Sequence, residues 1–119
     1  MKCVSLACLC MLAAPFTAHE AYACSLYFGK TPVNTEALTT CHSFARDVAR
    51  LNLHNVRQTA DEVAGETNDA YASITCIAPG HGEAAIAVIM VVSSSSAPAL
   101  QLRDLLVTKM RGIKKFDWL

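Results

Sequence analysis

The sequence predicts an α+β fold, a two-layer sandwich in which a mostly antiparallel four-stranded sheet carries two helices on one face. Stretches that alternate apolar and polar residues indicate the strands, and two stretches with apolar residues at every third or fourth position indicate the helices. One strand is apolar on both of its faces, which is typical of a central strand. The predicted element order is strand, helix, three strands, helix.

The first part of the predicted fold is one strand followed by one helix. Residues 25–30 form the strand, with Leu26 and Phe28 on the same side, and the Thr-Pro pair that follows is expected to end it. Asn34 or Thr35 is expected to cap the helix. The apolar residues at helical spacing form its buried stripe: Leu38, Cys41, Ala45, Val48 and Ala49.

Three further strands are predicted at residues 54–60, 71–78 and 83–92. Between the first two, residues 61–69 are acidic and are expected to form the most mobile internal loop of the domain. The three strands form an antiparallel meander, and the first helix returns the chain parallel to strand one. The expected spatial order is therefore 1-4-3-2.

The last predicted strand has two apolar faces, and a second helix follows it. One face carries Ile86, Val88, Met90 and Val92, and the other carries Ala85, Ala87, Ile89 and Val91. The helix begins at Ser96 and ends near Gly112, and its inner stripe is Leu102, Leu105, Leu106, Met110 and Ile113. Because two helices cover only one face of such a sheet, we expect the stripe that contains Ile89 to remain uncovered.

The N-terminus has the three parts of a cleavable export signal. A positively charged start is followed by an almost wholly apolar run at residues 4–14, and Ala21-Tyr22-Ala23 fits a signal peptidase site. We therefore expect residues 1–23 to be removed and residues 24–119 to form a single small domain in the periplasm or outside the cell. A membrane anchor, a buried helix, or a lipid anchor on Cys24 are the alternatives to ordinary export.

Cleavage would leave three cysteines, and an oxidising compartment favours one disulfide among them: Cys24, Cys41 and Cys76. Cys41 lies on the buried stripe of the first helix, and Cys76 shares the face of its strand with Ile74. Because both side chains point into the same layer, we predict a Cys41–Cys76 bond, with pairs that involve Cys24 as the alternative. The bond would contribute roughly 3 to 4 kcal/mol by restricting the unfolded chain.

Two short segments carry a resemblance to known proteins. Leu38-Thr-Thr-Cys41 and Ser73-Ile-Thr-Cys76-Ile-Ala78 are similar to segments in a group of small exported bacterial α/β domains of unknown function. The resemblance covers most of the predicted domain and rests on a helix cysteine, a strand cysteine and the element order. It implies no activity, because that group has none assigned.

Composition and spacing exclude several kinds of chemistry. The formal net charge is zero, far from the strongly basic balance of a nucleic-acid-binding domain. Cys41 and His42 are helix neighbours whose side chains point about 100° apart, so His42 is not placed to act as a base for Cys41. The histidines lack the spacing of a zinc site, and residues 61–69 lack the order of a calcium loop. We predict no catalytic, cofactor or metal site.

The sequence is therefore interpreted as that of a small exported, non-catalytic protein that binds another protein, as hydrolase inhibitors and immunity proteins do. The alternative is a small-ligand-binding protein or an enzyme whose site is assembled from distant residues. The expected partner is another protein or a second copy of this chain, bound through the sheet. The residues predicted to make contact belong to the acidic loop, the uncovered stripe and the C-terminal segment: Asp61, Glu62, Glu66, Ile89 and Trp118.

Overall fold

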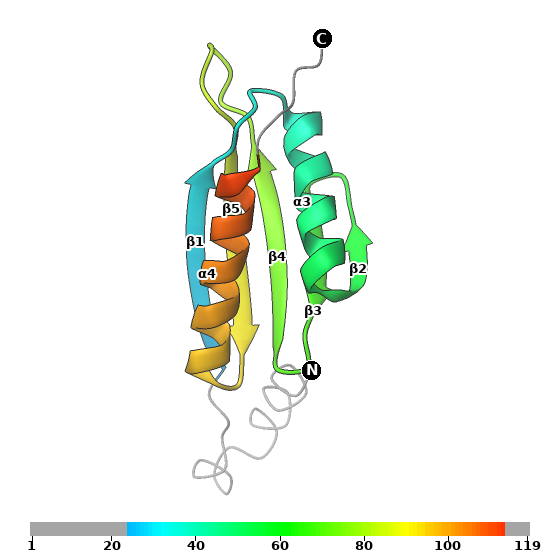
Figure 1. Cartoon of the computed structure of the whole chain (residues 1–119), viewed down its shortest axis with the longest axis vertical. Coiled ribbons are helices and arrows are strands. Elements are labelled where there is room, and N and C mark those ends of the chain that lie inside the picture. The colour runs from blue at the N-terminus through cyan, green and yellow to red at the C-terminus, as the bar shows by residue number, and fades with distance from the viewer. Residues whose placement is uncertain (1–23, 114–119) are drawn as a thin grey trace, which may run out of the picture.

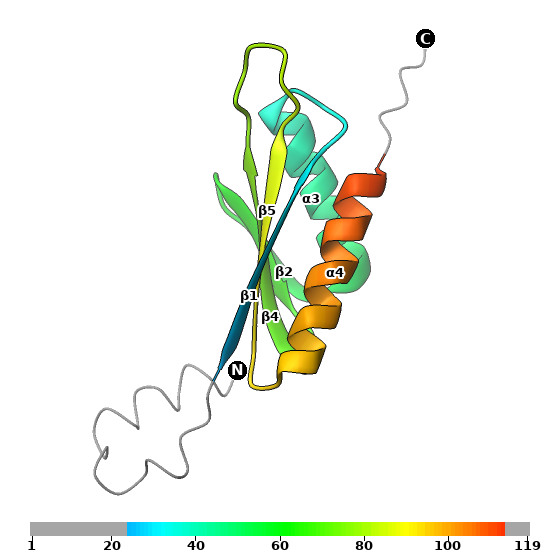
Figure 2. The ribbon, with the colours of Figure 1, turned by 90° about the vertical axis from the view of Figure 1, so that its left-hand side faces the viewer.

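The structure is a computed structural model that describes residues 24–113. Its helices and its sheet form the two layers that the sequence predicts. The predicted export signal and Trp118 lie outside the described residues. The elements are β1 (Ser25–Pro32), α3 (Leu38–Asn52), β2 (His54–Gln58), β3 (Glu62–Glu66), β4 (Ala70–Ile77), β5 (Ile86–Ser93) and α4 (Ser96–Gly112). The strands form one sheet, and both helices lie on the same side of it (Figures 1 and 2).

The strand order in the sheet is β1-β5-β4-β3-β2, and every neighbouring pair is antiparallel. β5 pairs along its whole length with β1 on one side and with β4 on the other, as its two apolar faces predict. The four predicted strands keep their expected relative order. The prediction of a four-stranded sheet is nevertheless wrong in one respect, because β3 lies between β4 and β2 and makes the sheet five-stranded.

The segment 61–69, expected to be a mobile loop, contains β3. The middle of this strand is buried: Val63, Ala64 and Gly65. Thr59 and Thr67 form the turns at its two ends, and each Oγ1 accepts hydrogen bonds from the backbone N–H groups two and three residues later, at 3.0 to 3.3 Å. Threonine is a weaker turn signal than glycine or proline, and carboxylates at both ends conceal the short apolar interior.

The helices begin close to their predicted starts. α4 begins at Ser96 as predicted, whereas α3 begins at Leu38 and its N-cap is Ala37, without a side-chain cap. Thr35, one of the two predicted caps, instead accepts a hydrogen bond at Oγ1 from the backbone N–H of Ala37 at 3.1 Å in the preceding turn. β1 also runs two residues further than predicted, to Pro32, because an edge strand tolerates a residue without an N–H group.

The core lies between the sheet and the two helices. Its largest fully buried side chains come from both layers and include Ile74, Ile89, Val91, Leu106 and Met110. The predicted Cys41–Cys76 disulfide is confirmed, with 2.09 Å between the sulfur atoms and 6.1 Å between the Cα atoms. It joins α3 to β4 across this core, which agrees with the prediction that both cysteines point into one layer.

Two arginines attach α4 to the edge strand β1. Arg111 Nε donates to Thr31 Oγ1 at 3.1 Å, and Arg103 Nη1 donates to the carbonyl oxygen of Phe28 at 3.4 Å. The guanidinium of Arg103 also lies over the ring of Tyr27, 5.9 Å from its centroid. A charged side chain along an edge strand hinders pairing with a strand of another chain. The edge of β1 is therefore protected, and the broad face of the sheet is the larger candidate surface.

Candidate functional site

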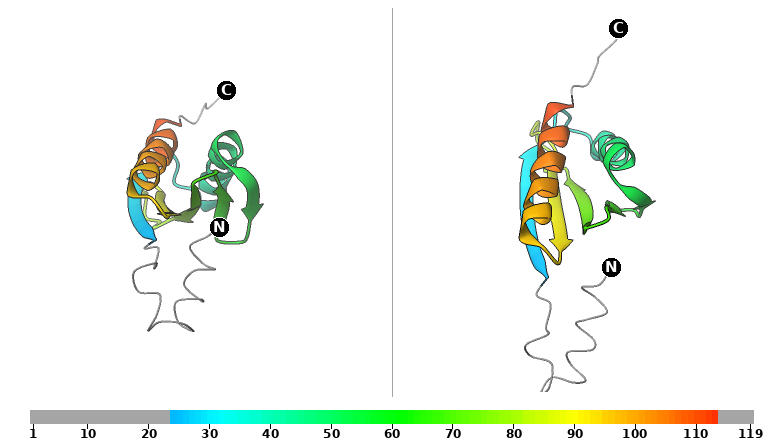
Figure 3. Two further views of the ribbon diagram at one scale, coloured as in Figure 1. Left: turned by 90° about the horizontal axis from the view of Figure 1, so that it is seen from below. Right: turned by 60° about the horizontal axis from the view of Figure 1, so that its bottom comes forward.

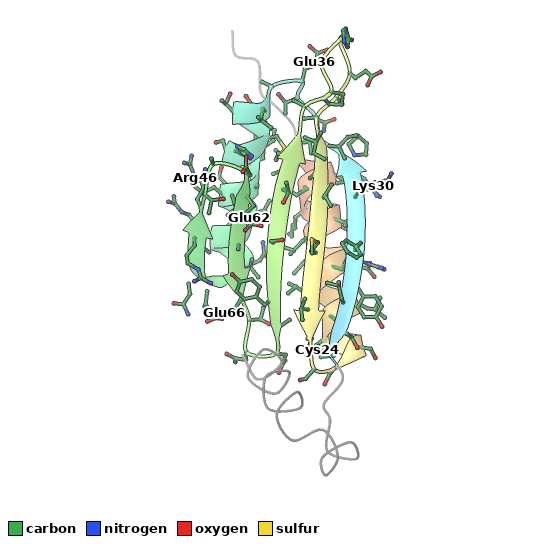
Figure 4. All side chains as sticks on the ribbon, turned by 180° about the vertical axis from the view of Figure 1, so that it is seen from behind. Cys24, Lys30, Glu36, Arg46, Glu62 and Glu66 are labelled. Carbon is green, nitrogen blue, oxygen red and sulfur yellow. A yellow bond between two sulfur atoms is a disulfide. The ribbon has the colours of Figure 1, made fainter. Side chains whose placement is uncertain are left out.

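The side of the sheet that faces away from α3 and α4 is covered by no other element of the described chain, and we call it the open face (Figures 2 and 4). Strand register determines its composition, because directly paired residues lie on the same face. Leu26 pairs with Val92 and Phe28 pairs with Met90, so these four side chains share the open face. On the next strand, Tyr71, Ser73, Thr75 and Ile77 continue the same rows.

The prediction that Ile89 lies on the uncovered face is wrong. Ile89 pairs with Gly29 on one side and Ile74 on the other, and its exposed fraction is 0%. Ala85, Ala87 and Val91 are equally buried. An uncovered apolar stripe does exist on β5, but it consists of the alternate residues: Ile86, Val88, Met90 and Val92.

Most of the open-face side chains of β1 and β5 are apolar, and we call them, with Ile77 at the end of β4, the apolar strip. Lys30 on β1, which pairs with Val88, is the charged exception on these strands (Figure 4). The apolar strip consists of Leu26, Phe28, Pro32, Ile77, Ile86, Val88, Met90 and Val92. Several of these side chains are large and exposed to solvent, Leu26 by 47%, Phe28 by 56%, Ile77 by 50% and Met90 by 37%. The open face of β1, β5 and β4 covers roughly 400 Å², which includes Lys30, Ser73 and Thr75. A largely apolar surface of this size often marks a functional site.

The open face changes character over β3 and β2, and we call this part the polar strip. Glu62 and Glu66 lie there at the two ends of β3, as Figure 4 shows. Arg57 Nη2 donates to the hydroxyl of Tyr71 at 2.8 Å, and its guanidinium lies 5.8 Å from the centroid of that ring. Glu66 Oε1 accepts a hydrogen bond from Asn55 Nδ2 at 2.7 Å. These contacts hold Arg57 and Glu66 in place, whereas no hydrogen bond to the carboxylate of Glu62 is found among the described residues.

Three of the predicted contact residues lie on β3 or directly before it. Asp61 is exposed in the turn before β3, and Glu62 and Glu66 are half-buried on the polar strip. Ile89 is in the core, and Trp118 lies outside the described residues. Sequence reasoning missed Phe28 and Met90 as surface residues. The signal that could have found them is the placement of Leu26 and Phe28 together on one side of an otherwise polar first strand.

Other kinds of site find little support in the described part of the chain. Cys41 is oxidised, so it is not a nucleophile, and Cys24 is exposed one residue before β1. His42, the neighbour considered as a base, is partly buried on α3. Residues 24–113 contain no group of three or more His, Cys, Asp or Glu side chains that could hold a metal ion. Over the same range, neither helix is both long and apolar enough to cross a bilayer.

Comparison with known proteins adds no identification: no family model matches the chain, and no curated protein matches it significantly. The resemblance of the two cysteine segments to small exported bacterial domains therefore stays a prediction.

Proposed function

We propose that this chain is an exported, non-catalytic protein that works by binding another protein through the open face of its sheet, in the manner of an inhibitor or immunity protein. The observation that carries the proposal is the apolar strip, on which Leu26, Phe28 and Ile77 are each about half exposed. Complete burial of such a side chain from water contributes about 1.5 to 3 kcal/mol, so covering the exposed half contributes about half of that per residue. A partner that covers these side chains recovers this free energy.

The charges beside the apolar strip favour a particular kind of partner. Asp61, Glu62 and Glu66 lie on the β3 side of the strip, Lys30 lies on β1, and Arg57 is already engaged by Tyr71. Complementary charge accelerates the encounter of two proteins and disfavours wrong partners. We therefore expect an apolar surface on the partner with lysine or arginine side chains on the side that meets β3. The disulfide supports the exported location, because such bonds persist in oxidising compartments.

Site-specific photo-crosslinking in the producing cell tests the proposal. A photoreactive residue at position 90 of the full chain should give a discrete adduct with another protein, whereas the same residue at position 105 should not. Met90 and Leu105 form a matched pair, because they are 37% and 39% exposed on opposite sides of the molecule. The captured protein should then be purified and its affinity for the wild-type chain and its variants measured.

Phe28→Glu and Met90→Glu should each weaken that affinity about tenfold or more, since a charge replaces a buried apolar contact. Leu105→Glu should leave it unchanged. Glu62→Lys should lower the association rate, and the difference from wild type should shrink as salt is added. Equal crosslinking at positions 90 and 105, or full affinity in the Phe28 and Met90 variants, would contradict the proposal.

A further inference from the structure

A second apolar surface lies on the other side of the molecule, in a groove between α3 and α4. The groove has a volume of about 480 Å³. Its lining comes from both helices and from the end of α4: Phe44, Asp47, Val48, Leu51, Asn52, Lys109 and Ile113. The two helices stand as separate ridges on the sheet, which Figure 3 shows from the end. Leu51 is 84% exposed at the margin of this groove.

We propose that residues 114–119 of this same chain, Lys-Lys-Phe-Asp-Trp-Leu, occupy the groove. This inference does not depend on the function of the open face. The described chain stops at Ile113, which is itself part of the groove lining. Asn34 Nδ2 donates to the carbonyl oxygen of Ile113 at 2.7 Å and holds the end of α4 at this point. The segment therefore begins where the groove begins.

Length and pattern of the segment match the groove. Six extended residues span roughly 20 Å, whereas Phe44 and Leu51 are separated by about 10 Å along α3. In an extended chain, alternate side chains point to the same side. Phe116 and Trp118 would then enter the apolar groove together, and Asp117 would point toward its rim.

The charges of the segment are complementary to those of the groove, for both the acidic and the basic residues. Asp47 lines the groove on α3, and the segment begins with two lysines, Lys114 and Lys115. Lys109 lines the groove on α4, and the segment contains one acidic residue, Asp117. A basic pair near Asp47 and an acidic residue near Lys109 favour this occupant over a generic apolar peptide. In this arrangement the segment shields Leu51 and Phe44 from water.

The only tryptophan of the chain reports directly on this contact, because Trp118 lies in the segment. In the native full-length protein, its fluorescence should be blue-shifted and protected from a soluble quencher, relative to the same protein in denaturant. Leu51→Glu should shift the emission to that of a solvent-exposed tryptophan and raise quenching several-fold. Leu105→Glu, the matched change outside the groove, should leave both unchanged. Circular dichroism checks that the variants fold, which is expected for such exposed positions.

A charge exchange tests whether the segment docks in the groove or elsewhere on the molecule. Asp47→Lys should increase quenching of Trp118, and adding Lys114→Glu and Lys115→Glu to that variant should restore protection. Emission of wild-type Trp118 identical to that of the denatured chain would overturn the inference. So would exposure of Trp118 by Phe28→Glu and not by Leu51→Glu, since that result would place the segment on the open face.

Discussion

Adjacent residues on β5 have opposite environments, and this contrast decides which surface of the sheet is available. Ile89 is fully buried under the helices, whereas Met90 is 37% exposed on the open face. Both side chains are large and apolar, so composition does not distinguish them. Only their position relative to α3 and α4 does.

Substitution by glutamate at these two positions tests the assignment. Ile89→Glu places an unpaired carboxylate in the core and should lower the free energy of unfolding by about 4 kcal/mol or more. Met90→Glu leaves the carboxylate in water and should change it by less than about 1 kcal/mol. Urea denaturation of the two variants measures both effects. A large loss of stability in Met90→Glu with a small loss in Ile89→Glu would show that the faces are reversed.

At the scale of the elements, the spacing between α4 and β1 depends on a glycine. A Cβ atom at Gly29 would lie 2.7 Å from Val107 Cγ2 and 3.2 Å from Arg103 Cγ on α4. Gly65 has a similar role under the end of α3, where a Cβ atom would lie 2.8 Å from Leu53 Cβ and 3.1 Å from the carbonyl oxygen of His54. The helices therefore approach the sheet where side chains are missing.

Substitution of these glycines by alanine should lower the stability by amounts that depend on the atoms around each glycine. Gly29→Ala should cost about 1 to 3 kcal/mol of stability through overpacking, with Gly65→Ala at the upper end because a Cβ and a backbone oxygen yield less than a side-chain tip. Gly112→Ala is the control, since it meets no atom within 4 Å and alanine favours a helix. Thermal or urea denaturation gives the order, and a Gly29 variant as stable as the Gly112 variant would refute this account of the packing.

At the scale of the whole molecule, the open face is asymmetric, and this affects how two copies could meet. Two copies that meet face to face are related by a two-fold axis between their sheets. If this axis is perpendicular to the strands, it places Glu62 of one copy against Glu66 of the other. An axis parallel to the strands through the middle of the sheet places the apolar strip on the polar strip. An axis along β5 matches the apolar strips, but the open face of β1, β5 and β4 contributes roughly 400 Å² per copy, about half of what each partner buries in a standard interface.

We therefore expect the chain to be a monomer at micromolar concentration, with the open face free for a different protein. Sedimentation velocity of the wild type should give a monomer, and Phe28→Glu should give the same result. A wild-type dimer that Phe28→Glu converts to a monomer would contradict this prediction and would identify a second copy as the occupant of the open face.

Much of the fold follows from local patterns along the chain. The two helices, four of the five strands, their relative order and the Cys41–Cys76 bond were predicted because helical and strand periodicities are carried by neighbouring residues. β3 was not predicted, because its interior of Val63, Ala64 and Gly65 is too short to show a period between acidic ends. Of the candidate surface, Asp61 is exposed before β3 and Glu62 is half-buried on it, and their role in binding stays a prediction.

Which face of β5 the helices cover is decided by the tertiary structure. Ile86, Val88, Met90 and Val92 are as apolar as the residues between them, so the pattern within the strand fits either orientation equally well. The choice depends on neighbours distant in sequence: Gly29 admits α4 on one face, and the disulfide brings α3 onto that same face of β4. Alternation within a strand defines two faces, but only packing against other elements decides which of them meets water.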